Sequence, residues 1–289
     1  MANLIIGYPN RIDSATLSGG SWEASLPLNN LKDRRLAKVA RSVDALAAST
    51  KFDIDLTTDR AIKLICLVKN NLSLDATYRI YGSTVSNFAT TVYDSGSSEV
   101  WQAVYNTTDL EWEDDNYWDG KPTAEYLADL STTSTLNLIH ILNQPIAARY
   151  WRVEITDTTN ADGYVEIGRV FIASQWQVTN NILYGASLGY ETNTQVETSL
   201  DDTEYFDIRR AYRNFQFELE SYDYNEGHAK LLDISRKVGI NEEVFVVPDP
   251  DDTVNMTRRA FLGRLKTLNP ITYPYFNTNR AAYEIKEIT

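Results

Sequence analysis

The sequence predicts a mainly β protein with two antiparallel sandwich units, the second of them flanked by one α-helix. Apolar residues recur in short runs, and many alternate with polar residues, which is the period of half-buried strands. Residues that favour strands are abundant, with 18 tyrosines in 289 residues. Strand patterns are followed by one helical pattern and then by further strands, an order that argues against alternating β and α elements.

The first half consists of strand patterns separated by turn residues. Residues 52–56 alternate apolar and acidic side chains, whereas residues 62–68 are almost continuously apolar and predict a more fully buried strand. Further strands are predicted at residues 78–81, 151–155 and 165–171. Many short strands with few helices are typical of an antiparallel sandwich.

The second half contains the one convincing helix. Asp223 is suited to cap its first turn, Glu226 follows three residues later as in a capping box, and Gly239 follows its last turn. Its apolar residues recur at helical spacing and are expected to pack on a sheet. These residues are Leu231, Leu232, Ile234 and Val238. Strands are predicted around the helix at 215–219, 243–247, 260–268 and 281–288.

The boundary between the two units is placed directly after a completed strand. Residues 171–172 end the first strand-rich unit, and the polar residues 179–181 follow as a loop. The predicted domains are therefore 1–172 and 173–289, each with its own core.

Charge and residue usage exclude several classes of function. Lys and Arg number 27 against 40 Asp and Glu, so the net charge of −13 argues against specific nucleic-acid binding and against a polybasic membrane anchor. No apolar run approaches the roughly 20 residues of a membrane-spanning helix. Residues 1–7 lack the basic start of a signal peptide, so we expect synthesis in a cytoplasm and no membrane insertion.

Residues that commonly carry chemistry are scarce. The single cysteine, Cys66, excludes an internal disulfide and cysteine-based metal sites, and the two histidines, His140 and His228, lie far apart in the sequence. Phosphate-binding, dinucleotide-binding, zinc-protease and nucleophile-elbow motifs are all missing. We expect no enzymatic activity, no catalytic residues, no cofactor and no bound metal.

One segment, residues 107–135, stands out by its composition. Its acidic part, residues 109–120, contains three aromatic residues, Trp112, Tyr117 and Trp118, among closely spaced carboxylates. So many charges cannot be buried together without partners, so we expect a loop that is exposed and projects from the first unit. The three aromatic side chains are the predicted contact site for a glycan or for another subunit.

Three other interpretations of this segment remain open. It can be a solvated surface loop whose tryptophans dock it to the sheet, or its oxygen atoms can hold calcium, although their spacing differs from an EF-hand. Glu111, Glu113 or Asp115 can supply the carboxylates of a glycosidase. Catalysis needs two carboxyl groups about 5–10 Å apart across a cleft, which one short loop is poorly suited to provide.

The first half resembles the discoidin-type jelly roll found in coagulation factors, over about residues 15–172. The matching segments are 36–42, 52–56, 62–68, the Asn70-Asn71-Leu72-Ser73 turn, 78–83, 148–155 and 166–172. The chain departs from secreted members in having one cysteine, and in its insertion at 107–135. Members of this family often bind glycans or lipid surfaces through loops at one end, but a fold does not transfer an activity.

The whole chain also resembles minor tail proteins of long-tailed bacteriophages, in particular the distal tail protein of the baseplate hub. The resemblance is carried by residues 185–191, the helix up to Gly239, residues 244–249, 258–264 and 283–288. It implies a C-terminal domain of tail-tube type that forms a hexameric ring, with the jelly roll pointing outward. It also implies localisation in the virion tail, with tail-tube, hub and tape-measure proteins as partners.

Three hypotheses on function follow. In the first, the chain is a structural component of a phage tail tip, and an acidic ring lets the genome pass because it does not hold phosphate. In the second, it is a carbohydrate-binding adhesin of the virion that contacts a host surface glycan and has no ring role. In the third, it is an enzyme that cleaves glycans.

Overall fold

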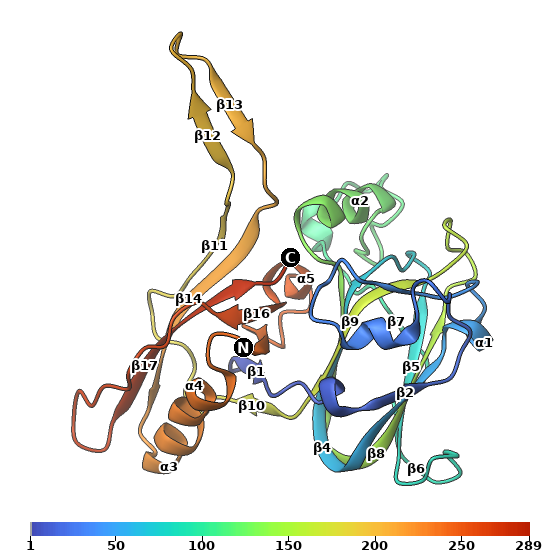
Figure 1. Cartoon of the computed structure of the whole chain (residues 1–289), viewed down its shortest axis with the longest axis horizontal. Coiled ribbons are helices and arrows are strands. Elements are labelled where there is room, and N and C mark those ends of the chain that lie inside the picture. The colour runs from blue at the N-terminus through green and yellow to red at the C-terminus, as the bar shows by residue number, and fades with distance from the viewer. Residues whose placement is uncertain (1) are drawn as a thin grey trace.

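The computed structural model describes residues 2–289, apart from the side chains of Thr107, Thr133 and Tyr224. The strands of this part form antiparallel sheets of eight, seven and two strands, joined by short helices. The predicted mainly β, antiparallel fold is confirmed. Figure 1 shows a jelly-roll unit beside a second sheet with helices, and an arm that extends away from both.

The eight-stranded sheet forms the jelly-roll unit. Its order is β3-β9-β4-β8-β5-β6, with β2 beside β4 and β7 beside β5. The strands are β2 (Thr16–Ser18), β3 (Ala40–Arg41), β4 (Phe52–Asn70), β5 (Thr77–Ser83), β6 (Thr91–Asp94), β7 (Ser98–Glu99), β8 (Asn137–Thr156) and β9 (Glu166–Ala173). Short helices interrupt them: η1 (Ile12–Ser14), η2 (Leu28–Lys32), α1 (Ala47–Thr50), η3 (Thr107–Asp109) and α2 (Ala124–Thr133).

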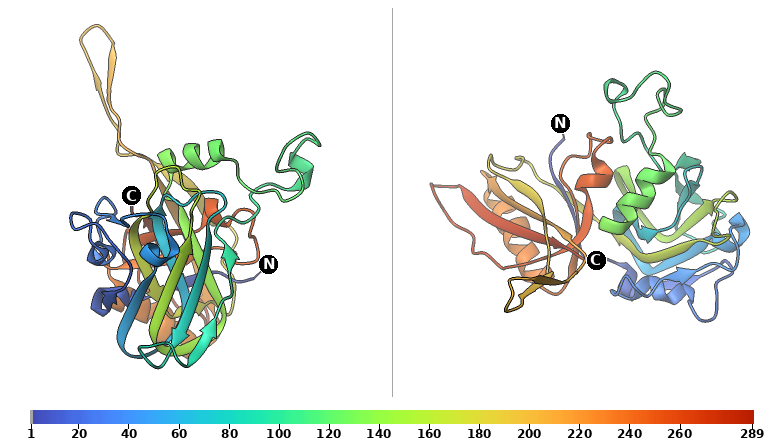
Figure 2. Two further views of the ribbon diagram at one scale, coloured as in Figure 1. Left: turned by 90° about the vertical axis from the view of Figure 1, so that its right-hand side faces the viewer. Right: turned by 90° about the horizontal axis from the view of Figure 1, so that it is seen from above.

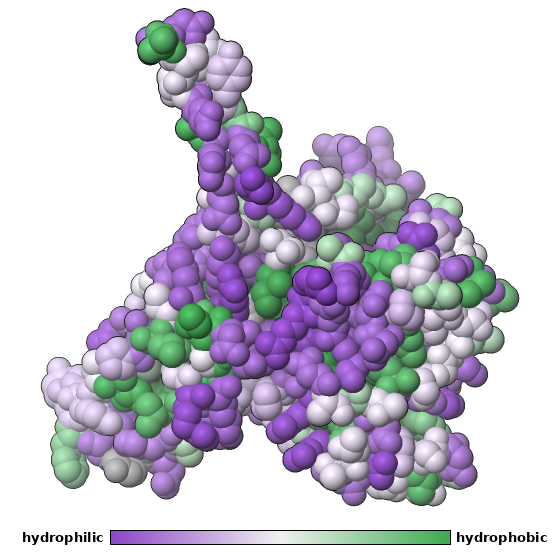
Figure 3. Space-filling view, viewed as in Figure 1, coloured by the Kyte–Doolittle hydropathy of each residue, from purple (hydrophilic) through white to green (hydrophobic). Residues whose placement is uncertain are grey.

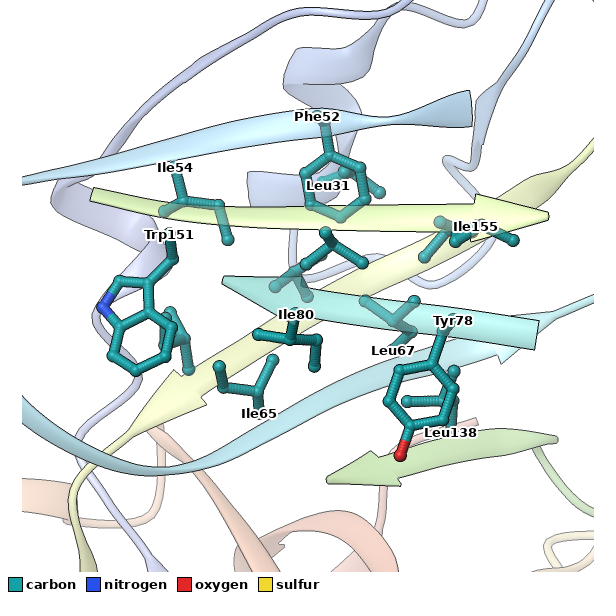
Figure 4. Packing of buried hydrophobic residues seen from close by; sticks show 14 of the residues in the cluster. Leu31, Phe52, Ile54, Ile65, Leu67, Tyr78, Ile80, Leu138, Trp151 and Ile155 are labelled. Atoms are coloured by element: carbon teal, nitrogen blue, oxygen red, sulfur yellow. The ribbon is translucent and has the colours of Figure 1, made fainter. Parts of the chain in front are cut away.

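The two longest strands, β4 and β8, let this sheet curl around its core. The sequence predicts separate strands at 52–56 and 62–68, whereas the structure joins them in β4, whose pairing with β8 shifts register between Asp55 and Arg60. Such irregularities bend and twist a strand pair. Phe52 and Ile54 from one half of β4 therefore meet Ile65 and Leu67 from the other half in one buried cluster (Figure 4).

The second sheet has seven strands in the order β10-β1-β15-β16-β17-β14-β11. They are β1 (Ile5–Gly7), β10 (Gln175–Gln177), β11 (Ser187–Glu191), β14 (Tyr212–Ser221), β15 (Glu243–Val247), β16 (Phe261–Leu265) and β17 (Asn279–Glu287). A helical segment covers one face of it, and the short helix α5 (Met256–Arg259) precedes β16.

The domain boundaries differ from the prediction at the N-terminus. Residues 5–7 form β1, which lies between β10 and β15 in the second sheet, with Ile6 opposite Trp176 and Val246. The chain therefore starts in the second unit, builds the jelly roll and returns through β10, which occupies part of the connection predicted after residue 172. The prediction placed residues 1–7 in the first unit because they precede it in the sequence. Their pairing with a strand about 240 residues away leaves no local pattern in the sequence. Whether each unit folds alone stays a prediction.

The predicted helix is present and runs from α3 (Tyr224–Glu226) through a π-helical turn η4 (Gly227–Leu232) to α4 (Asp233–Val238). Gly239 follows it with a φ of +56°, as expected of the residue that ends a helix. Leu231, Ile234 and Val238 are buried against the sheet. Leu232 was wrongly predicted to be buried: it is 48% exposed, because neighbouring helical residues point about 100° apart.

Asp223 caps the first turn as predicted, because its carboxylate accepts a hydrogen bond from the Asn225 amide at 2.9 Å. The second bond of a capping box, from the Asp223 amide to the Glu226 carboxylate, is not formed. The Glu226 carboxylate accepts hydrogen bonds from the Trp176 indole at 3.2 Å, the Thr179 amide at 3.0 Å and the Ser221 hydroxyl at 2.8 Å. The Asp223 amide instead donates to the Ser221 hydroxyl. Glu226 thus ties the helix to the end of β10 rather than closing its first turn.

The two units share a third apolar cluster. In β4, Ile65 and Leu67 face the jelly-roll core, while Leu64, Cys66 and Val68 face the second unit and pack with residues of β15, among them Phe245. Residues 64–68 of β4 and the whole of β15 are buried on both faces, which explains why these two stretches are almost continuously apolar. The seam between the units therefore contains a third buried apolar cluster, in addition to the core of each unit.

Two buried arginines add ion pairs at this seam. Arg169 of β9 is fully buried and donates from Nε to the carboxylate of Glu243 in β15 at 3.0 Å, and from Nη2 to Asp13 at 2.6 Å. Arg213 of β14 is equally buried and donates from Nε to Glu287 at 2.9 Å. The Thr135 hydroxyl, from the jelly roll, donates to the same Glu287 carboxylate at 3.0 Å.

The arm is a two-stranded extension of the hairpin between β11 and β14. It consists of β12 (Gln195–Thr198) and β13 (Glu204–Asp207), which pair only with each other. Hydrophobic side chains lie along it and at its tip among hydrophilic ones (Figure 3). Among residues 2–289, none of the helices has the length and hydropathy that a membrane-spanning segment requires.

Candidate functional site

The acidic-aromatic segment projects from the jelly roll as a loop between β7 and α2, apart from the arm (Figure 2). Its neck is closed at Gly120, whose carbonyl accepts from the amides of Val104 at 2.8 Å and Tyr105 at 3.1 Å. Gly120 has a φ of +62°, and a Cβ there would lie 2.5 Å from the Tyr105 carbonyl oxygen. Only glycine fits this neck.

The structure brings the three predicted contact residues together. Ring centroids lie 5.4 Å apart for Trp112 and Tyr117, and 5.3 Å apart for Trp118 with each of the other two. The rings are inclined at 58–87° to one another, the tilted or edge-to-face arrangement that aromatic pairs prefer. We call Trp112, Tyr117 and Trp118 the ring cluster. It is self-packed, yet Trp112 is 70% and Trp118 is 77% exposed.

The loop's backbone is folded by its own carboxylates. The Asp114 carboxylate accepts from the Glu111 amide at 2.9 Å, and the Asp119 carboxylate accepts from the Lys121 amide at 3.1 Å. The Asn116 side chain donates to the Lys121 carbonyl at 2.7 Å. These bonds hold the ring cluster on a shaped support, so its exposed faces are preformed.

The same geometry bears on the catalytic and calcium interpretations. Glu111, Glu113 and Asp115 are all exposed to solvent, whereas the acid and base of a glycosidase need contrasting, partly enclosed surroundings. Within the residues that the structure describes, no three His, Cys, Asp or Glu side chains gather as a metal site. The arrangement can present flat apolar faces and hydrogen-bond acceptors, which is chemistry for binding.

A polar cavity beside the ring cluster was missed by the sequence analysis. It has a volume of about 490 Å³ and is lined by residues that include Trp101, Asp119, Lys121 and Thr253. Lys121 pairs there with Glu99 at 2.9 Å. Asp119, the residue after Trp118, is the part of the cavity wall that comes from the loop carrying the ring cluster. Its walls come from both units, and no local pattern relates Trp101 to Thr253.

A second groove, of about 570 Å³, depends on an element that was not predicted. Helix α2, whose first turn is capped by the Thr123 hydroxyl, lies within the segment expected to be a loop. Together with residues 70–75 and 159–162 it forms the groove, with Leu72 and Leu127 among the lining residues.

The histidine and cysteine of the jelly roll are structural, as the sequence indicated. His140 lies between two tyrosine hydroxyls, with Tyr78 3.0 Å from Nδ1 and Tyr93 2.7 Å from Nε2. Burial lowers the pKa of His140 to about 4, so the ring is neutral at pH 7. Burial raises the pKa of the Cys66 thiol, which makes it unreactive.

Comparison with known proteins finds similarity to solved structures only. No family model and no curated protein matches the chain. A family 32 carbohydrate-binding module from a family 31 glycoside hydrolase of Clostridium perfringens is 15% identical, with a TM-score of 0.37 over 58% of this chain and 99% of the module. The family 32 module of NanJ from the same organism, solved with galactose, is also 15% identical, with a TM-score of 0.37 over 59% of this chain and 99% of that module.

The lectin domain of lectinolysin, solved with Lewis b antigen, is 12% identical, with a TM-score of 0.36 over 58% of this chain and 98% of that domain. These are the proteins to which the chain is similar, at a level that leaves its function to be argued from its own residues.

Proposed function

We propose that this chain is a non-catalytic glycan-binding protein that contacts its ligand through the ring cluster of the jelly roll. The observation that carries the proposal is the pair of exposed tryptophans, Trp112 and Trp118, packed edge to face on a preformed loop. Indole faces exposed in this way gain free energy by covering the apolar face of a sugar ring. The surrounding carboxylates and the adjacent polar cavity supply partners for sugar hydroxyl groups.

The test is binding of the purified chain to a glycan array, followed by calorimetry. Galactose and Lewis b antigen, the ligands named for the neighbours above, are the first probes. Trp118→Ala should weaken binding about tenfold or more, since one stacked ring contributes about a kcal/mol or more. Tyr275→Ala is the matched control, because Tyr275 is also 77% exposed but lies on the loop between β16 and β17. Equal binding by Trp118→Ala and the parent chain would refute the proposal.

A second candidate function, a structural subunit of a bacteriophage tail tip, is favoured by the arm. An isolated two-stranded hairpin is at best marginally stable in water, and this one exposes apolar residues along its length, namely Val196, Leu200, Tyr205, Phe206 and Ile208. Such an element needs a partner. The proposal places six copies in a ring within the virion tail, after synthesis in the host cytoplasm, with the jelly roll outward. Tail-tube, hub and tape-measure proteins are the proposed neighbours.

The assembly function is tested by measuring the mass of the purified chain over a range of concentrations. A cryo-EM map of the phage particle would show whether the chain is part of the tail tip. Replacing residues 195–207 by a short Gly-Ser turn should abolish assembly while leaving the thermal midpoint of the chain unchanged. Assembly that survives this deletion would show that the arm is not an assembly element.

A further inference from the structure

The tip of the arm is strongly acidic. Residues 195–207 contain five carboxylates and no Lys or Arg. The first cations, Arg209 and Arg210, stand at the root, where Arg209 pairs with Asp207 at 2.6 Å. Asp201 and Asp202 are exposed at the turn beside Leu200, which is fully exposed. The tip therefore combines one large apolar side chain with uncompensated negative charge.

The seam between the two units carries a cavity of the opposite character. Its volume is about 590 Å³, and its lining includes Arg264 of β16, Lys286 of β17, and the apolar residues Leu36, Ala37 and Ile288. Arg264 and Lys286 stand directly opposite each other in neighbouring strands. Like charges placed this way are destabilising unless an anion lies near them.

Carboxylates near this cavity are already engaged elsewhere. Glu243 is bound to Arg169, and Glu287 to Arg213. Among the described side chains, Lys286 makes only a contact with the Tyr212 ring, at 3.9 Å from its centroid. Burial lowers the pKa of Lys286, and the charges of Arg264 and Lys266 lower it further, while Glu191, which is itself paired with Lys266, opposes this shift. The cavity is thus suited to bind an anionic segment that also carries an apolar residue.

The arm cannot fill the cavity of its own chain. It extends roughly 30 Å beyond Glu191 and Tyr212, at about 3.3 Å per residue, and points away from the body (Figure 1). The donor and acceptor surfaces are different surfaces of one chain, and such a contact joins copies head to tail into a closed ring or an open filament.

We propose that the acidic tip of the arm docks in the seam cavity of a second copy of this chain. Leu200 packs on Leu36, Ala37 and Ile288, while Asp201 and Asp202 approach Arg264 and Lys286. This inference rests on the assembly function proposed above and names the contact that would build the ring.

The test uses two charge-reversed variants of the full chain. Asp201→Lys/Asp202→Lys and Arg264→Glu/Lys286→Glu should each weaken assembly by about 100-fold or more, because like charges then meet in the contact. An equimolar mixture of the two variants should restore assembly, since each tip then meets an oppositely charged cavity in alternating copies. Light scattering after size-exclusion chromatography gives the mass, and thermal midpoints show that the variants are folded.

Glu113→Lys/Asp115→Lys provides the matched control, because it makes the same change of charge at two exposed residues of the other projecting loop. This control should assemble like the parent chain. A disulfide between Leu200→Cys and Ala37→Cys of different copies would place the contact directly, since Cys66 is buried.

Two results would overturn the inference, and they are distinguishable from failure of the assembly function. If the parent chain assembles but either charge reversal leaves its assembly intact, or mixing fails to restore it, the contact is wrong while the assembly function stands. If the parent chain stays monomeric at every concentration and is absent from the map of the particle, the assembly function fails, and the inference fails with it.

Discussion

Apolar side chains are buried at the seam between the two units and exposed on the arm. At the seam, Leu64, Cys66 and Phe245 are completely buried, and the arginine charges are paired within one chain. On the arm, Leu200 and Phe206 are exposed, and the tip charges have no cation beside them. The apolar residues of the seam are covered within a single copy, whereas those of the arm are exposed to solvent. The difference separates the part of the fold that is complete in one chain from the part on which the proposed assembly rests.

The largest effect is expected from breaking the seam. Arg169→Ala leaves the buried Glu243 carboxylate without its cation, with the Asn10 amide still donating to it, and should lower the free energy of unfolding by about 3–5 kcal/mol. Urea denaturation measures this. Arg149→Ala is the control, because it removes a partly exposed ion pair with Asp55 and should cost at most about 1 kcal/mol. If the two variants lost the same free energy of unfolding, the buried ion pair at the seam would contribute no more than the partly exposed pair at the surface.

The helix on the second sheet gives the next effect. Leu231→Ala should cost roughly 2–5 kcal/mol, because the side chain is buried among the apolar residues of the sheet. Leu232→Ala, one position along and 48% exposed, should change the free energy of unfolding far less. Denaturation curves that do not separate the two leucines would place the helix at the periphery.

A pH titration sharpens the contrast between interior and arm. The folded-state pKa of His140, about 4, lies below its ordinary value of 6.5, so the unfolded chain binds a proton between these pH values that the folded chain does not. The contribution of His140 to the free energy of unfolding is fully present above about pH 6.5. It should be lost as the pH drops toward 4, by up to about 3 kcal/mol. His140→Gln should flatten the profile in this window relative to the parent chain, as measured by urea denaturation at a series of pH values. The same slope in the variant and the parent chain would contradict this assignment.

The smallest effect on stability is expected from the arm itself. Phe206→Ala should change the free energy of unfolding of the single chain by less than about 0.5 kcal/mol, because the ring is exposed. Phe215→Ala, in the sheet that the arm extends, should cost about 3–5 kcal/mol. A strongly destabilised Phe206→Ala would show that the arm packs on its own chain.

The sequence predicts elements well where the signal is local. Alternation located the strands that contain Phe52 and Phe215, and Gly239 marked the end of the helix correctly. The sequence could not show that β1 joins the second sheet, because Ile5 pairs with Val247 across almost the whole chain. It also could not distinguish a residue buried at the seam, such as Leu64, from one buried inside the jelly roll.

The candidate site was predicted in the same uneven way. Trp112, Tyr117 and Trp118 were singled out because they are aromatic residues on one short acidic segment, and the structure adds that their rings pack together. The neighbouring cavity did not, because Trp101 and Thr253 meet only after both units are in place. The seam cavity was missed for the same reason: Arg264 and Lys286 are separated by a long loop and become neighbours only through strand register.

The position of β1 has a consequence for how the protein is made. The jelly-roll strands lie between residues 16 and 173, so that unit can close while the ribosome is still translating the rest. Ile5 and Ile6 are synthesised before the jelly roll, yet their partner β15 follows only at residues 243–247. For most of translation, β1 and the outer face of β4 expose apolar surface of the kind that chaperones recognise. A chain truncated before residue 243 would fold into a closed jelly roll whose β4 face is apolar and exposed, and it would be prone to aggregate.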